Sequence, residues 1–218
     1  MDGILIINKP KGITSHDVVD YIRNRFKIKK VGHAGTLDPM ATGVIVVLLG
    51  KATKKSAQFL NDDKEYIATL FLGRSTDTQD STGKVLIEKK VTALREDFIK
   101  KTFDSFLGER EQVPPMVSAK KYKGTKLYKL ARRGETVSRK PCRINIYEIE
   151  ILNCNLPEID FRVKCSKGTY VRTLCEDMGK ALRYPAHMSN LSRTRSGRFS
   201  LDKAHLLEEI DERHIQPA

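Results

Sequence analysis

The chain has 218 residues, of which 39% are hydrophobic, and carries a formal net charge of +13 at pH 7. This length and apolar content suffice for one substantial core or two small ones, and the composition does not point to a disordered or collagen-like chain. No apolar run approaches the roughly 20 residues needed to span a bilayer, and the N-terminal apolar stretch is too short for a secretory signal. We therefore expect a cytoplasmic protein without a membrane partner.

The first half of the chain is predicted to alternate strands and helices. Strands are expected at 3–8, 44–49, 65–72 and 85–88, of which the first is predicted to be buried and the second is continuously apolar. Helices are expected at about 14–26, 52–60 and 92–106, with Thr14 or Ser15 as the cap of the first and Gly108 ending the last. Glycine-rich turn residues at 31–43 and polar turn residues at 74–83 separate these elements.

The second half follows a Pro114-Pro115 break. Strands are expected at 144–152, 159–165 and 188–199, and helices at 126–133, at 169–182 and from Asp202 onward. Because several strands form adjacent hairpins, the pattern favours an α+β fold, in which a mixed and mostly antiparallel central sheet is flanked by helices. We expect one catalytic domain over residues 1–218, with 113–143 as an inserted basic arm.

The basic residues are concentrated in two segments. Residues 113–143 contain ten Lys or Arg and one acid, and residues 162–198 contain nine against two. Tyr122, Tyr128 and Tyr170 are interleaved with them, and aromatic rings offer unstacked bases a platform. The alternative is a solvated basic face. We interpret the two segments as an RNA-binding surface whose affinity depends on salt.

Metal chemistry is not indicated. The four cysteines contain no C-x-x-C pair, and the five histidines are scattered without the spacing of a zinc site. Phosphate-loop, dinucleotide and zinc-deaminase signatures are also missing. We therefore expect reduced thiols and chemistry carried by a carboxylate without metal or cofactor.

The densest group of special residues is Gly-His-Ala-Gly-Thr-Leu-Asp-Pro-Met-Ala-Thr-Gly at 32–43. Its glycines permit positive φ angles or close approach, and Pro39 disfavours a helical backbone at Asp38. Asp38 is therefore a candidate catalytic carboxylate, although an ordinary turn aspartate is the alternative. Arg172, near the start of a helix, suits bidentate pairing with an anion, and its alternative is a surface arginine. For Tyr66 the alternative is strand packing.

Seven motifs in order resemble the TruB family, the bacterial pseudouridine synthases that modify the T-loop uridine of tRNA. They begin with Lys9-Pro10, Gly12 and Ser15, and continue through 32–43, 64–66, 76–80, 113–124, 165–172 and 191–197. The resemblance implies a pseudouridine-synthase fold and an isomerisation without cofactor. The uracil is cut from C1′, rotated and rejoined through C5.

The resemblance also assigns roles to individual residues. Asp38 matches the nucleophile, Arg172 its arginine partner, and Tyr66 a tyrosine that stacks on the base and is a candidate base for the C5 proton. His33 matches a histidine that fills the space of the flipped nucleotide, and Leu191 a residue lining the uracil pocket. Further expected substrate-binding residues are Asp80, Lys9, Lys120, Lys121, Lys167 and Tyr170. The arm resembles a thumb that grips the T-arm of tRNA.

One departure accompanies this resemblance, because family members usually continue into a C-terminal RNA-binding PUA-like module and this sequence stops at Ala218. Two other functions stay open: a guide-RNA-dependent pseudouridine synthase and an RNA-folding chaperone. The short sequence argues against the first, and the complete set of Asp38, Tyr66 and Arg172 argues against the second. We expect a monomeric enzyme whose partner is tRNA.

Overall fold

The computed structural model describes residues 1–218, which group into two compact units. Unit 1 comprises Met1–Ile67 and Leu191–Ala218, and unit 2 comprises Ala68–Asn190. The basic arm at 113–143 belongs to unit 2, and the single catalytic domain stays a prediction. No helix is both long enough and apolar enough to cross a membrane. All four cysteines are free thiols, as expected.

The α-helices are α1 (Ser15–Phe26), α2 (Ser56–Leu60), α3 (Glu96–Asp104), α4 (Leu127–Ala131) and α5 (Val171–Ala181). The 3-10 helices are η1 (Gly50–Lys55), η2 (Leu201–Lys203) and η3 (Glu212–His214). The strands are β1 (Gly3–Lys9), β2 (Val31–Ala34), β3 (Thr42–Leu49), β4 (Lys64–Leu72), β5 (Arg74–Thr76), β6 (Val85–Glu88), β7 (Gly108–Gln112), β8 (Lys121–Tyr122), β9 (Thr125–Lys126), β10 (Cys142–Asn155), β11 (Glu158–Cys165), β12 (Ala186–Ser196), β13 (Phe199–Ser200) and β14 (His205–Leu206).

The sheet of unit 1 has the order β14-β1-β3-β12, with β2 also paired to β3 and β13 to β12. β1 and β3 are antiparallel, whereas β14 runs parallel to β1 and β12 runs parallel to β3, where Arg193 lies opposite Gly43. Alternate residues of β1 and β3, such as Ile4, Ile6 and Val46, form a core with Phe59. The expected mixed, mostly antiparallel sheet with flanking helices is therefore confirmed.

Helix α1 begins as the sequence predicts. The Thr14 hydroxyl accepts a hydrogen bond from Asp17 N at 3.1 Å, and the Asp17 carboxylate accepts one from Thr14 N at 2.7 Å. This capping box satisfies two backbone donors at the helix start. The backbone hydrogen bond from Thr14 lowers the pKa of Asp17. The box therefore stabilises the fold at neutral pH and loses this contribution as the pH falls through that lowered pKa.

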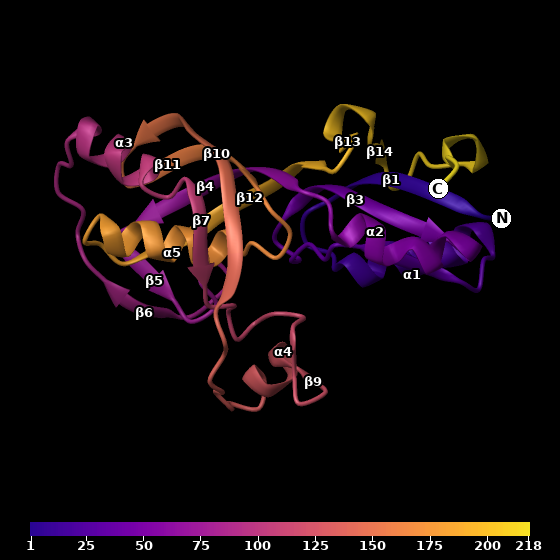
Figure 1. Ribbon diagram of the computed structural model, residues 1–218, viewed down its shortest axis with the longest axis horizontal. Coiled ribbons are helices and arrows are strands. Elements are labelled where there is room, and N and C mark those ends of the chain that lie inside the picture. The colour runs from indigo at the N-terminus through magenta and orange to yellow at the C-terminus, as the bar shows by residue number, and fades with distance from the viewer. The chain divides into compact units, whose positions relative to one another are not determined.

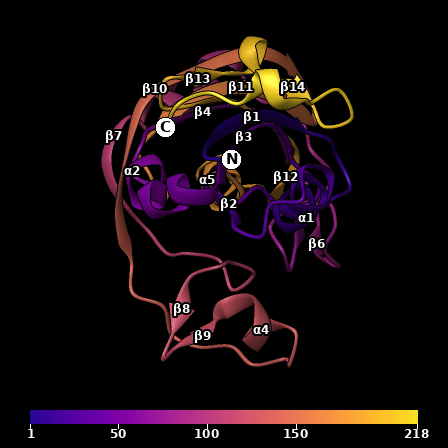
Figure 2. The ribbon, with the colours of Figure 1, turned by 90° about the vertical axis from the view of Figure 1, so that its right-hand side faces the viewer.

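In unit 2 the strand order is β12-β4-β11-β10-β7, and β5 and β6 form a separate hairpin. Helix α3 packs Phe103 against Phe161 of β11, with the ring centroids 5.4 Å apart. Strands β7 and β10 flank the basic arm, and Figures 1 and 2 show α4, β8 and β9 projecting away from the sheet at the ends of these strands. Strand pairing thus joins the two ends of the arm, since Cys142 lies opposite Gln112.

Several sequence predictions are wrong in detail. The helix expected from Asp202 is replaced by two 3-10 turns and β14, because this segment pairs with β1: His205 lies opposite Ile7, and Gln216 bonds Ile4. Residues 31–34, expected as a turn, form β2 on β3. Helix α3 begins only at Glu96. Strand β7 was not expected.

Replacing Thr14 with Ala is expected to lower the free energy of unfolding by about 1 kcal/mol, because the Asp17 amide loses its acceptor. Urea unfolding at pH 7 measures the change. The matched control is Thr14→Ser, which keeps the hydroxyl and should unfold near the wild-type midpoint. Equal destabilisation by both variants would show that the methyl group, and not the cap, stabilises α1.

Candidate active site

Asp38 lies half-buried on the loop between β2 and β3. Its carbonyl accepts a hydrogen bond from Ala41 N at 3.0 Å, which closes a four-residue turn. Asp at the first and Pro at the second position are typical of such a turn. Leu37, Met40 and Ala41 are buried around it. The turn therefore presents the Asp38 side chain while its neighbours anchor the loop in the core.

The segment that follows β1 is hydrogen-bonded to this loop. The Ser15 hydroxyl donates to Leu37 O at 2.9 Å and accepts from Leu37 N at 2.8 Å, so it satisfies both backbone groups of the residue before Asp38. Gly12 N donates to Pro39 O at 2.8 Å. The residues on both sides of Asp38 are thus fixed by a segment more than 20 positions away in the sequence. The resemblance included Gly12 and Ser15, but the sequence did not show this contact.

Lys9 is fully buried. Its ammonium donates to three backbone carbonyls, Pro10 O at 2.9 Å, Ile13 O at 2.7 Å and Pro39 O at 3.4 Å. These bonds use all three donors of the side chain. Through the Pro39 contact Lys9 supports the loop that carries Asp38. Its expected substrate-binding role stays a prediction.

The surroundings of Lys9 strongly shift its pKa. Burial lowers its pKa to about 8, and the negative charge of Asp38 opposes this shift while the positive charge of Arg193 adds to it. Because the folded-state pKa lies below the ordinary value of 10.5, Lys9 is mostly charged at pH 7 and its charge weakens the fold at pH values below about 8.

Arg193 on β12 is a further buried cation at the Asp38 loop, and the sequence did not assign it a role in the site. Its side chain is 1% exposed, and it donates to backbone carbonyls at both ends of the Asp38 loop. A basic residue within a Ser-Arg-Thr-Arg run gives no signal of burial. The parallel pairing of β12 with β3 is what brings it under the loop.

Three other predicted site residues of unit 1 lie on strands, outside the loop that carries Asp38. Tyr66 on β4 and Leu191 on β12 are buried, and His33 on β2 is half-buried opposite Val47. Burial of Tyr66 agrees with both the catalytic and the packing interpretation. The roles of these residues in contacting a base stay predictions.

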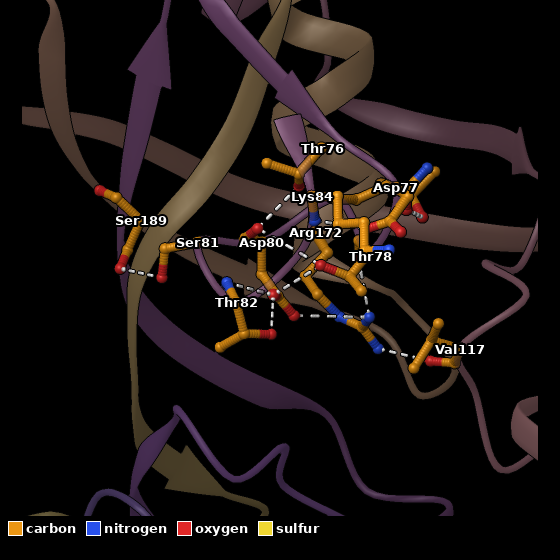
Figure 3. Close-up of polar contacts among 12 residues, drawn as sticks. Thr76, Asp77, Thr78, Asp80, Ser81, Thr82, Lys84, Val117, Arg172 and Ser189 are labelled. Atoms are coloured by element: carbon orange, nitrogen blue, oxygen red, sulfur yellow. Dashed lines mark hydrogen bonds and ion pairs between the residues drawn. The ribbon is translucent and has the colours of Figure 1, made fainter. Parts of the chain in front are cut away.

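Arg172 lies in the first turn of α5, and its side chain is only 4% exposed. The alternative of a solvated surface arginine is therefore wrong. Its Nη1 donates to Thr78 O at 3.0 Å and its Nη2 to Val117 O at 2.8 Å, and its Nη1 lies 3.7 Å from Asp80 Oδ2 (Figure 3). The guanidinium thus joins α5 to the 76–80 turn and to the base of the basic arm.

Asp80 is held in turn by its own neighbours. Its Oδ1 accepts hydrogen bonds from the Thr78 hydroxyl at 2.8 Å, from Thr82 N at 2.9 Å and from the Thr82 hydroxyl at 2.6 Å (Figure 3). The turn is fixed to β12, because Met188 N donates to Gln79 O and Ser81 N to Met188 O. The hydrogen-bonded polar turn expected here is confirmed. A substrate contact of Asp80 stays a prediction, whereas its pairing with Arg172 is observed.

The remaining predicted residues of unit 2 lie near α5 or on the arm. Tyr170 is half-buried, and buried Gln112 donates to its carbonyl and accepts from its amide, which fixes the start of α5. Lys167, Lys120 and Lys121 are exposed, and the Lys120 ammonium contacts Cys142 Sγ at the base of the arm. Exposed cations on the arm are placed to contact phosphates.

Each unit thus holds one candidate catalytic group in a fixed position. In unit 1 a carboxylate is presented on a loop supported by two buried cations. In unit 2 a guanidinium is aimed by two backbone carbonyls and one carboxylate. A preorganised carboxylate can act as a nucleophile or as a proton acceptor, and a buried guanidinium can stabilise developing negative charge.

Comparisons with known proteins agree on one family. The family described as "TruB family pseudouridylate synthase (N terminal domain)" matches residues 23–171, and "tRNA pseudouridylate synthase B C-terminal domain" matches residues 172–216. The chain is 50% identical to tRNA pseudouridine synthase B of Clostridium tetani over 99% of its length and 75% of that protein. Its identity to the Protochlamydia amoebophila protein of the same name is 53%, over 93% of this chain and 77% of that one.

Solved structures give the same fold. The structure titled "Crystal Structure of a Cbf5-Nop10-Gar1 Complex" has a TM-score of 0.78 and 32% identity, covering 99% of this chain and 60% of that chain. A second, titled "Structure of H/ACA RNP bound to a substrate RNA containing 2'-deoxyuridine", has a TM-score of 0.74 and 30% identity, covering 99% of this chain and 59% of that chain. The expected pseudouridine-synthase fold is thereby confirmed.

Replacing Asp80 with Asn is expected to lower the free energy of unfolding by about 3 kcal/mol, because the buried Arg172 charge loses its carboxylate but keeps two carbonyls. Urea unfolding measures this difference. The control is Asp104→Asn, which removes a charge from an exposed side chain of the same unit and should leave the midpoint unchanged. An unchanged midpoint for Asp80→Asn would show that the pair contributes nothing to stability.

Proposed function

Because this chain belongs to the TruB family of pseudouridylate synthases, we propose that it isomerises the T-loop uridine of tRNA to pseudouridine. The observation that carries this proposal is the Asp38 carboxylate, held on a rigid loop at the position of the family's nucleophile motif. Identities of 50% and 53% to two tRNA pseudouridine synthases B support tRNA as the substrate.

The reaction needs no second substrate, because the product is an isomer of uridine. Asp38 either adds to the base or the sugar, or removes a sugar proton to form a glycal. In each route the C1′–N1 bond breaks, the uracil rotates, and a C1′–C5 bond forms. The proton on C5 must then leave to a base, and Tyr66 is the candidate acceptor. No step requires a metal or an electron carrier.

From the family resemblance, we propose that Arg172 is the ion-pair partner of the Asp38 carboxylate. A guanidinium beside the carboxylate keeps it ionised and directs one oxygen to the reacting carbon. Arg172 is suited to this role, because its carbonyl and Asp80 contacts fix the plane of the guanidinium before substrate arrives. Leu191 then lines the uracil pocket. His33 occupies the space of the flipped nucleotide, which recovers part of the few kcal/mol lost on unstacking.

The basic arm serves as the grip on the T-arm. Its exposed lysines, Lys120, Lys121, Lys123 and Lys126, lie on or beside the β8–β9 hairpin, and Tyr122 and Tyr128 stand among them. Ammonium groups that neutralise phosphates release counterions and supply affinity without reading sequence. A single chain carries both Asp38 and Arg172, so we propose that a cytoplasmic monomer is the active form.

Two other functions give different outcomes. A guide-RNA-dependent synthase is supported by the similarity to the Cbf5 and H/ACA structures, but at about 30% identity this similarity is well below that to the tRNA enzymes. An RNA chaperone would bind tRNA without changing it. The anchored Asp38 and Arg172 argue for catalysis, because buried charges cost stability that binding alone does not require.

The central test follows tritium release from an unmodified tRNA transcript labelled at uracil C5. The wild-type protein should release tritium without added RNA, and Asp38→Ala should release none while its tRNA affinity stays close to that of the wild type. Asp104→Ala serves as a matched aspartate control and should be fully active. A requirement for guide RNA would favour the first alternative, and binding without release by any protein would favour the chaperone.

The arm is tested by neutralising Lys120, Lys121, Lys123 and Lys126 to Gln. The slope of log affinity for tRNA against log salt should fall by about one for each phosphate that the arm no longer neutralises. The control replaces Lys84, Lys90, Lys100 and Lys101, which are exposed lysines of the same unit outside the arm. A slope that falls equally in both variants would mean that general charge, and not the arm, binds the phosphates.

A further inference from the structure

Arg193 lies at the centre of the Asp38 loop's attachments. Its Nε donates to Val44 O at 2.6 Å and its Nη2 to Gly35 O at 3.0 Å. Gly35 directly follows β2, and Val44 lies near the start of β3, so these two carbonyls stand on either side of the loop. One planar side chain therefore spans the loop that carries Asp38, from a strand about 150 positions further along the chain.

The loop is shaped to receive this arginine. Gly43, with φ +101°, lies opposite Arg193 in the parallel pairing, and a Cβ there would come within 2.3 Å of the Arg193 carbonyl oxygen. At Gly35, with φ +83°, a Cβ would lie 3.3 Å from Arg193 Nη1. The first glycine admits the arginine backbone and the second admits its guanidinium. Contact with Arg193 therefore explains two of the motif's three glycines, Gly35 and Gly43.

The buried charge of Arg193 lowers the stability of the fold. Both hydrogen-bond acceptors are backbone carbonyls and not carboxylates, and a buried cation without an acidic partner loses more hydration energy than two neutral acceptors return. Leu or Met would fill the same volume without that cost. Burial is the main cause of the lowered pKa of Lys9, and Asp38 and Arg193 both act on it as well, so each of these two charges lies within electrostatic range of Lys9.

We propose that Arg193 is a positioning residue for Asp38: its guanidinium clamps both ends of the loop and holds the carboxylate in the orientation that the reaction needs. Arg193 does not touch the substrate, and it acts through the backbone of Gly35 and Val44. The inference rests on the proposed function, because the reaction is the process that this orientation serves. A competing explanation is that Arg193 only staples the fold.

The test variant is Arg193→Lys. Lysine keeps the charge, but a single ammonium lacks the separated donors of a guanidinium fork, so it cannot bind both carbonyls in the same geometry. Misplacement of a reacting group by about 1 Å costs on the order of 100-fold in rate. Arg213→Lys is the matched control, because Arg213 is an exposed arginine of the same unit and lies outside both basic segments.

Three measurements are made on each full-length protein: single-turnover tritium release at saturating tRNA, tRNA affinity, and amide hydrogen exchange. Arg193→Lys is expected to slow release by about 10- to 100-fold with unchanged affinity. Exchange should accelerate at residues 35–42 and stay unchanged in β1, which pairs with β3 but lies outside the loop. The control should match the wild type throughout.

Two results would overturn the proposal. Wild-type release by Arg193→Lys would show that the clamp is not needed, and faster exchange throughout unit 1 would assign Arg193 to the fold alone. If Arg193→Lys does not fold, Arg193→Gln applies the same test, because its amide keeps one N–H donor group but lacks the guanidinium fork that reaches both carbonyls. If the wild type itself releases no tritium, the proposed function fails, and the exchange of residues 35–42 still decides whether Arg193 orders the loop.

Discussion

A buried cation must find acceptors for its N–H groups, because it loses its hydration when it leaves water. Lys9, Arg172 and Arg193 all donate to backbone carbonyls. The carbonyls that accept from the two arginines, and one of the three that accept from Lys9, belong to segments remote in sequence. A carbonyl cannot move without moving its chain. Each of these side chains therefore fixes the path of a loop. These contacts hold the two candidate catalytic groups, the Asp38 carboxylate and the Arg172 guanidinium, in position.

This arrangement explains why so few residues suffice for the chemistry. The Asp38 turn is bounded by Leu37 and Pro39, whose backbone groups are bonded to Ser15, Gly12 and Lys9. Arg172 is oriented in the same manner by Thr78 and Val117. A preorganised carboxylate and a preorganised guanidinium spend no energy on reorientation during the reaction, which is the main source of electrostatic catalysis.

The sequence predicted elements whose signals are local. The Thr14 cap and the apolar run of β3 fixed their elements, and the order of motifs around Asp38 led to the family. The predictions that failed depended on distant partners. The segment after Asp202 carries an acidic, helix-like composition, but it forms β14 because β1 offers an edge. Arg193 resembles a surface residue in its local sequence, and only the pairing of β12 with β3 buries it.

The contact of Arg172 with Val117 at the base of the basic arm has an evolutionary consequence. The acceptor is a main-chain oxygen, so the identity of the side chain at position 117 is not constrained by it. Residues beyond this point can change, and with them the shape and charge of the RNA that is held, while the arginine keeps its acceptor. The orientation of Arg172 is thus independent of the side chain at position 117, which leaves this position of the arm free to vary under selection.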